Sequence, residues 1–168
     1  MGLIICKLAQ NIPSFVLFPP YWSAAAVLFL LYKITAIMSN EAQIKSRIDN
    51  WAKAINQRDW GGVLAWHHEN FVMYDLVPPL QSDGIEAYRE TFVLFFENLQ
   101  SGDDSFVVVD PHIVAGEDAA FFFSPMKCVY YDKKEQRIIH LDFRLTIGFR
   151  KIDGEWWFVH EHHSEPAQ

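Results

Sequence analysis

The second half of the chain consists of strand-like segments separated by turn signals, and this pattern constrains the fold more than any other feature. Segments rich in Val and aromatic residues cover 106–115, 119–131, 137–151 and 156–164. Asp153-Gly154, the last of the turns between them, is a strong signal for a two-residue β-hairpin. Short turns between neighbouring strands produce antiparallel pairs. The sequence therefore predicts an antiparallel meander after residue 105.

Helical patterns come before these strands. Apolar residues recur at helical spacing over 41–55 and 84–99, and Tyr88 is among those on the buried side of the second segment. Asp59 can cap a short helix over 60–66. Between the helices, residues 71–74 form a predicted strand that ends at Asp75, and two prolines make residues 77–80 a loop. Helices that precede a meander predict an α+β fold, in which the helices cover one face of a curved sheet.

The first 37 residues differ from the rest in composition. Residues 8–32 carry no charge, and this apolar stretch is long enough to cross a bilayer. Three alternatives remain open: an over-extended start in which the protein begins at Met38, a membrane anchor or signal peptide, and a packed core helix. We therefore divide the chain into an apolar extension, residues 1–37, and a domain, residues 38–168. We expect the domain to be cytoplasmic, and membrane-anchored only if the extension is translated and retained.

Charge and cysteine content exclude several classes of partner. The net charge of −7 argues against nucleic acid, because binding phosphate groups requires a basic surface. Cys6 and Cys128 are too few for a disulfide framework, and we expect Cys128 to be a buried, inert thiol. His160 and His162 share a strand face but have only Asp75 as an obvious third ligand, so we expect no metal and no cofactor.

The register of the last two strands follows from their two-residue turn. If residues 153–154 form this turn, Phe149 faces Phe158 and Ile147 faces His160. The apolar side of these pairs should be the covered face of the sheet. The same alternation brings two more polar residues to that face: His162 and Ser164.

Asp75 reaches the same covered face from its own strand. Phe71, Met73 and Asp75 alternate on one side, so Asp75 lies at the inner end of an apolar row. Buried polar side chains need partners, and two alternatives follow: Asp75 and the histidines bond to one another or to the backbone and only fix the fold, or they line a ligand site. Three polar groups in one cavity favour a ligand site. Desolvation should raise the pKa of Asp75, unless a protonated His lies near.

The opposite face of the last two strands mixes aromatic and charged residues. It carries Trp157, Val159, Arg144 and Glu161, and the same alternation places His163 there. Such a face is too aromatic for the solvent-exposed face of a monomer. We therefore expect a homodimer through the sheet. Residues 67–68, a pair of histidines, are expected to cap the C-terminus of the preceding helix.

Three segments carry a resemblance to a known family: residues 51–62 (WAKAINQRDWGG), 71–75 (FVMYD) and 81–84 (QSDG). With them, residues 43–166 resemble the SnoaL-like, ketosteroid-isomerase-like branch of the nuclear transport factor 2-like superfamily. Residues 153–164 are also similar to the association domain of calcium/calmodulin-dependent kinase II. The resemblance implies a cone-shaped, cystatin-like antiparallel sheet wrapped around N-terminal helices. It is weak for the reaction, because this superfamily includes isomerases, cyclases, dehydratases and pure binding modules.

The resemblance also implies roles for individual residues. Asp75 matches the general base that removes a proton next to a ketone in ketosteroid isomerases, and Trp51 stands where those enzymes place the oxyanion-stabilising Tyr. Ile147 stands about where the second, protonated Asp of that oxyanion hole is expected. An indole is a donor but not an acid, so His160 or His162 would supply the missing donor.

Two functions are consistent with this site. In the enzyme hypothesis, Asp75 abstracts a proton next to the carbonyl of an apolar substrate, in an isomerase, cyclase or dehydratase reaction, and His160 stabilises the enolate. In the alternative, the domain is a non-catalytic ligand-binding or dimerisation module. A cavity of at least about 300 Å³ lined by Asp75 and His160 would favour the enzyme hypothesis. The ligand would be contacted by Trp51, Met73, Ile147, His162 and Ser164.

Overall fold

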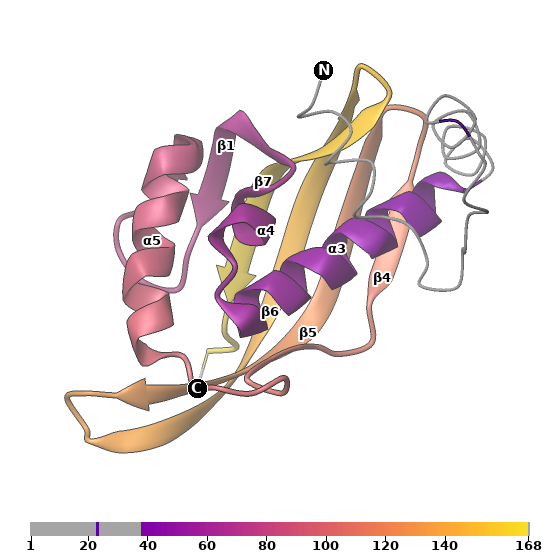
Figure 1. The fold of residues 1–168 in the computed structure, drawn as a ribbon. Coiled ribbons are helices and arrows are strands. Elements are labelled where there is room, and N and C mark those ends of the chain that lie inside the picture. The colour runs from indigo at the N-terminus through magenta and orange to yellow at the C-terminus, as the bar shows by residue number, and fades with distance from the viewer. Residues whose placement is uncertain (1–22, 24–37, 168) are drawn as a thin grey trace.

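The structure is a computed structural model that describes Ser23 and residues 38–167 (Figure 1). The apolar extension, for which the sequence left an over-extended start, an anchor or signal, and a core helix open, lies outside the described residues apart from Ser23. Within the described part of the chain, no helix is both long and apolar enough to cross a membrane.

The described elements follow the predicted order. The helices are α3 (Asn40–Gln57), α4 (Trp60–Leu64) and α5 (Gly84–Asn98). The strands are β1 (His67–Tyr74), β2 (Ser82–Asp83), β3 (Phe106–Val108), β4 (His112–Ala115), β5 (Ala119–Asp132), β6 (Arg137–Ile152) and β7 (Glu155–Ser164). The α+β fold class is confirmed. The predicted strand over 106–115 is two strands, and the two histidines that were expected to cap a helix instead begin β1.

The strands form one curved, open sheet. Its order is β2-β1-β7-β6-β5-β3, and β4 also pairs with β5. The pairs β5–β6 and β6–β7 are antiparallel, which confirms the meander. β1 runs parallel to β7, so the sheet is mixed. No hairpin joins β1 to β7, because nearly the whole domain lies between them in the chain, and a long connection permits a parallel pair.

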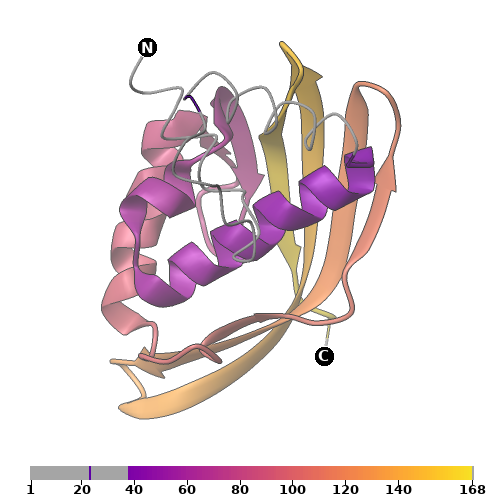
Figure 2. The same cartoon turned by 45° about the vertical axis from the view of Figure 1, so that its right-hand side comes forward.

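α3 crosses the concave side of the sheet, while α5 lies beside β1 (Figures 1 and 2). The buried side of α3 includes Ile44, Ile48, Trp51 and Ile55, at the predicted helical spacing. Each fully buried apolar side chain of this size contributes about 1.5–3 kcal/mol to folding. The inward side chains of the long strands include Phe122, Met126, Leu145, Ile147 and Phe149, all of them buried.

Polar contacts hold the helices in place. The Ser39 hydroxyl accepts a hydrogen bond from the backbone N–H three residues on, at 3.2 Å, and so caps α3. After α3 the chain turns at Arg58, whose Nη2 donates to the backbone oxygen of Leu99 at 2.6 Å. This bond ties the end of α3 to the end of α5. Asp59 accepts from the Gly61 N–H at 3.0 Å and caps α4, as predicted.

A β-bulge interrupts the register between β6 and β7. Phe149 lies opposite Phe158, as predicted, but the next residue of β6, Gly148, lies opposite His160. Val159 is therefore an extra residue in β7. An extra residue in one strand inverts the alternation of side chains beyond it.

The inverted alternation exchanges the residues that face the core at the end of β7. The residue opposite Ile147 is Glu161, not His160, and Glu161 is fully buried. The sequence-based prediction that His160 and His162 point into the cone is therefore wrong. Glu161 and His163, two residues apart, take the inward positions instead.

β1 is irregular as well. His67 lies opposite Phe158, whereas Val72 lies opposite His160, so five steps along β1 correspond to two steps along β7. The irregular stretch separates two buried side chains of β1, His67 and Phe71. His67 is thereby brought into the core, close to the inward residues of β7.

Candidate acid–base site

A carboxylate and an imidazole meet where β1 and β7 end. Because these strands are parallel, Asp75, which follows β1, and His163, near the end of β7, lie at the same edge of the sheet. His163 Nδ1–H donates to Asp75 Oδ1 at 3.0 Å, and the Leu76 N–H donates to the same oxygen at 2.7 Å. The side chains of His163 and Asp75 are 16% and 19% exposed, so both are close to solvent.

A second carboxylate lies behind this pair. Glu161 Oε2 is 3.4 Å from His163 Nε2, an ion-pair contact rather than an aligned hydrogen bond. Glu161 Oε1 accepts from the Tyr88 hydroxyl and from His67 Nε2–H, each at 3.3 Å. A buried carboxylate can keep its charge only with partners of this kind. Residues of three elements therefore contact the Glu161 carboxylate: His67 of β1, Tyr88 of α5 and His163 of β7.

The polar contacts continue into the centre of the core. Trp51 Nε1–H donates to the Tyr88 hydroxyl oxygen at 3.0 Å, and both side chains are buried. The His67 ring stacks between Tyr88 and Phe158, with 4.5 Å between ring centroids on each side. A continuous set of contacts thus runs from α3 through α5 and β7 to the loop after β1. We call the residues of this set the polar chain; they are Trp51, Tyr88, His67, Glu161, His163 and Asp75.

The partners of the polar chain decide its charges. Burial favours the neutral form of His163, but the hydrogen bond to Asp75 and the contact with Glu161 outweigh it and raise the pKa of His163 from 6.5 to about 9. Burial would raise the pKa of Glu161, but the contacts with His163 and His67 lower it from 4.5 to about 2. At neutral pH, His163 is a cation and Glu161 an anion.

Asp75 and Tyr88 complete this electrostatic arrangement. Burial would raise the pKa of Asp75, but the hydrogen bond and charge of His163 hold it below 3.8, so the predicted rise is offset as the sequence allowed. Burial, together with the charge of Glu161, raises the pKa of Tyr88 well above 10. Tyr88 is therefore a neutral donor, and Asp75 is a carboxylate at neutral pH.

The two histidines predicted for the site lie on the other face of β7. His160 Nδ1 is 2.9 Å from the Val72 backbone oxygen. The rings of His160 and His162 both contact Tyr74, at 4.8 Å and 5.8 Å between centroids, and Tyr74 is 41% exposed. The predicted partnership of Asp75 with His160 or His162 is wrong, because the bulge turns both rings outward.

Three of the other predicted residues lie where the sequence placed them. Trp51, Met73 and Ile147 are buried in the core, and none is more than 2% exposed. Of these, Trp51 joins the polar chain directly. Ser164 is half-buried at the end of β7, but it lies opposite Arg144 and not Phe143, so the prediction that it faces the covered side is wrong. The ligand-binding roles of these residues stay predictions.

Sequence reasoning missed four members of the polar chain: Glu161, His163, Tyr88 and His67. One signal could have found two of them. Gly148 interrupts the strand pattern of β6, and a glycine inside a strand often marks a bulge or a close approach. A Cβ atom at Gly148 would lie 3.5 Å from Cβ of His160. Placing the bulge opposite Gly148 turns Glu161 and His163 inward.

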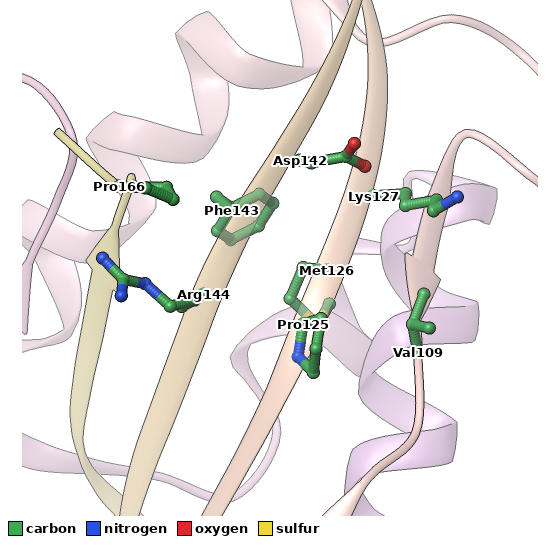
Figure 3. Close-up of a pocket in the computed structure, with 8 residues that line it drawn as sticks. All are labelled: Val109, Pro125, Met126, Lys127, Asp142, Phe143, Arg144 and Pro166. Atoms are coloured by element: carbon green, nitrogen blue, oxygen red, sulfur yellow. The ribbon is translucent and has the colours of Figure 1, made fainter. Parts of the chain in front are cut away.

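Two hollows in the described part of the chain lie away from the polar chain. One, of about 320 Å³, is lined by residues that include Val109, Pro125, Arg144 and Pro166 (Figure 3). The other, of about 380 Å³, lies beside the last turns of α3. Asp75 and His160 line neither of them, so neither hollow is the cavity that would have favoured the enzyme hypothesis. In the described part of the chain, no group of three or more His, Cys, Asp and Glu side chains is arranged to hold a metal ion.

Solved structures with the same fold support the architecture. An NTF2-like protein of unknown function from Pseudomonas putida KT2440 is 28% identical, with a TM-score of 0.65, over 78% of this chain and 91% of that chain. A ketosteroid isomerase-like protein from Erwinia carotovora atroseptica SCRI1043 is 19% identical, with a TM-score of 0.64, over 78% and 100%. A protein with a cystatin-like fold from Nostoc punctiforme PCC 73102 is 13% identical, with a TM-score of 0.59, over 77% and 96%.

Sequence comparison points to the same group of proteins. No curated protein sequence matches the chain significantly. The SnoaL-like domain family matches residues 44–168, which is most of the chain and nearly all of its described part. The predicted cone-shaped fold and the resemblance that implied it are both confirmed. The chain therefore belongs to the SnoaL-like domain family and has the NTF2-like fold.

Proposed function

We propose that the protein catalyses proton transfer next to the carbonyl group of a small apolar molecule, as an isomerase or a lyase, with Asp75 and His163 as its acid–base pair. One observation carries the proposal. Among the described residues, the two hydrogen bonds to Asp75 both fall on Oδ1, from His163 and from the Leu76 N–H. Oδ2 of an ionised carboxylate near solvent is thereby left to accept a proton from a substrate.

The pair can balance the charge of such a step. Asp75 Oδ2 takes a proton from the carbon beside the carbonyl, the C–H electron pair forms the enolate, and negative charge moves to the substrate oxygen. The carboxylate becomes neutral as the oxyanion forms. In this step the His163 cation is close to the negative charge both while it is on Asp75 and after it has moved to the substrate oxygen. A fixed cation near a developing oxyanion lowers the barrier. Returning the proton to another carbon gives isomerisation, and donating it to a hydroxyl group that departs as water gives elimination.

The surroundings of the pair favour an apolar substrate. The Phe143 ring lies 5.5 Å from the His163 ring, edge to face. Leu76, the residue after Asp75, packs against the hydrophobic core. An apolar rim around a charged pair strengthens its electrostatic interactions, because it excludes water.

The test is proton exchange in D₂O with a panel of apolar ketones and enones, followed by proton NMR. The wild-type chain should exchange hydrogen for deuterium beside the carbonyl of at least one compound. Asp75→Asn keeps the shape and removes the base, so its rate should fall about 10²–10⁴-fold. An Asp75→Asn rate equal to that of the wild type would remove Asp75 from the reaction.

A second observation favours the alternative that the domain is a dimerisation module. The outer face of β4 and β5 exposes Val114, Phe121 and Phe123, with exposed fractions of 53%, 45% and 40%. Val114 lies opposite Phe121 in the sheet, so these side chains form one patch. We propose that a second copy of the chain covers this outer patch. Burying large apolar side chains is a strong drive for association.

Charges beside the outer patch suit a symmetric partner. Lys127 lies opposite Asp142, and Arg144 lies two residues further along β6, all three exposed on the outer face. A two-fold interface must be complementary to itself, and neighbouring charges of both signs allow this. The sequence predicted that Glu161 lies on the outer face through which the dimer forms. This prediction is wrong, because Glu161 is buried in the cone. Trp157, which packs edge to face on Trp66, is only half-exposed.

A further inference from the structure

We infer that Glu161 is a positioning residue that keeps His163 cationic at the moment when Asp75 loses its charge. The inference rests on the proposed function and concerns the charge of the same site. Its observation is geometric: each ring nitrogen of His163 faces a different carboxylate, Nδ1 that of Asp75 and Nε2 that of Glu161.

The two carboxylates differ in what the reaction does to them. Asp75 becomes neutral when it accepts a proton from the substrate, so at that step it no longer stabilises the positive charge of the imidazolium. Glu161 cannot take part, because it is fully buried behind His163 and faces no solvent. If Asp75 were the only anion beside the ring, His163 would tend to lose its own proton when the oxyanion most needs a cation nearby.

Glu161 stays ionised through contacts that do not involve Asp75. Its Oε1 accepts hydrogen bonds from Tyr88 on α5 and from His67 on β1, and Tyr88 is itself fixed by Trp51 on α3. From β6, Leu145 lies opposite His163 in the sheet and the Phe143 ring contacts the His163 ring; neither side chain carries a charge. Among the described residues, the charged and titratable groups that face His163 are therefore Asp75 and Glu161, with Tyr88 and His67 behind Glu161.

Asp75→Asn provides a test that needs no substrate, because the amide imitates the neutral, protonated carboxyl group. The full chain is labelled with ¹⁵N-histidine, and the protonation of each ring is followed by NMR between pH 5 and 10. His163→Gln identifies the signals of His163. The exposed ring of His162 serves as an internal reference. Asp142→Asn, which neutralises an exposed carboxylate of the outer face, is the matched control.

We expect His163 in Asp75→Asn to carry protons on both ring nitrogens at pH 7, as in the wild type and in Asp142→Asn. A neutral ring at pH 7, with a midpoint near the ordinary value of about 6.5, would overturn the inference. In the double variant Asp75→Asn/Glu161→Gln the ring should be neutral at pH 7, and a cationic ring there would also overturn it. If the double variant does not fold, Asp75→Asn alone decides.

The outcome is separable from that of the proposed function. A protein that exchanges no substrate proton but keeps His163 cationic in Asp75→Asn supports the charge arrangement and refutes the reaction. A protein whose activity depends on Asp75, but whose His163 turns neutral in Asp75→Asn, supports the reaction and refutes the role of Glu161.

Discussion

Oδ1 of Asp75 and Nδ1 of His163 lie 3.0 Å apart, although 88 positions separate the two residues in the chain. Two features of the sheet bring them together. The parallel pairing of β1 with β7 places the ends of both strands at one edge. The extra residue in β7, Val159, turns His163 rather than His162 toward that edge. The acid–base site therefore depends on a single inserted residue.

The free energy of unfolding should be highest at mildly acidic pH and should fall at both lower and higher pH. The pKa of His163 is raised from 6.5 to about 9 in the folded protein. The stabilisation that follows is fully present below pH 6.5 and is lost as the pH rises toward 9. The pKa of Glu161 is lowered from 4.5 to about 2 in the folded protein. The stabilisation that follows is fully present above pH 4.5 and is lost as the pH falls toward 2. Urea unfolding from pH 2 to 10 should show highest stability between about 4.5 and 6.5. In His163→Gln the alkaline decline should weaken; an unchanged decline would contradict the charge assignment.

Tyr88→Phe should destabilise the fold through the polar chain. The change removes one donor from Glu161 and leaves the buried Trp51 N–H without an acceptor. We expect a loss of about 1–3 kcal/mol in the free energy of unfolding, and an acid decline that is smaller and ends at a higher pH, because the pKa of Glu161 moves back toward 4.5. Tyr74→Phe, at an exposed tyrosine of β1, is the control and should cost less than about 0.5 kcal/mol. Equal losses for the two variants in urea unfolding would refute the role of Tyr88.

Deleting Val159 should be far more damaging than shortening it. The deletion removes the bulge, turns His160 and His162 inward without partners, and moves Glu161 out of the core. An unpartnered buried polar group costs about 1–3 kcal/mol, so the deletion should lower the free energy of unfolding by several kcal/mol or prevent folding. Val159→Ala keeps the bulge and should cost less than about 1.5 kcal/mol. A deletion variant as stable as Val159→Ala would show that the bulge does not fix the site.

The outer patch should control self-association. Phe121→Ser and Phe123→Ser each remove an exposed aromatic side chain from the proposed dimer face and should weaken the dimer at least about tenfold. Leu80→Ser, at a loop residue that is 93% exposed, is the matched control and should leave the dimer unchanged. Sedimentation equilibrium of the full chain at micromolar concentration checks this. A wild-type chain that stays monomeric, or a Leu80 variant that dissociates as readily, would refute the proposal.

The fold could be predicted from the sequence because local signals agree with it. The spacing of Ile44, Ile48 and Trp51 predicted α3, and the Asp153-Gly154 turn predicted the pairing of Phe149 with Phe158. Hydrophobic periodicity and turn chemistry act over a few residues, so they can be read without knowledge of the remaining chain. The parallel pairing of β1 with β7 was not predicted, because no local signal links strands so distant in sequence.

The candidate site could be predicted only in part, for a related reason. Asp75 was found because the alternation along its own strand is regular at that point. His163 and Glu161 were assigned to the wrong face, because strand alternation carries a register error to every residue beyond it. Tyr88 was predicted as a core residue from helical periodicity, which is correct but does not reveal a hydroxyl group bonded to Glu161.

The deuterium exchange rates of two single variants show whether His163, and not His160, is the partner of Asp75 in proton transfer. His163→Gln removes the cation beside Asp75, whereas His160→Gln changes a ring on the outer face of β7. We expect His163→Gln to lower kcat for exchange at least about 10²-fold, and His160→Gln to stay within about threefold of the wild type. The reverse order, or an equal loss in both variants, would contradict this assignment.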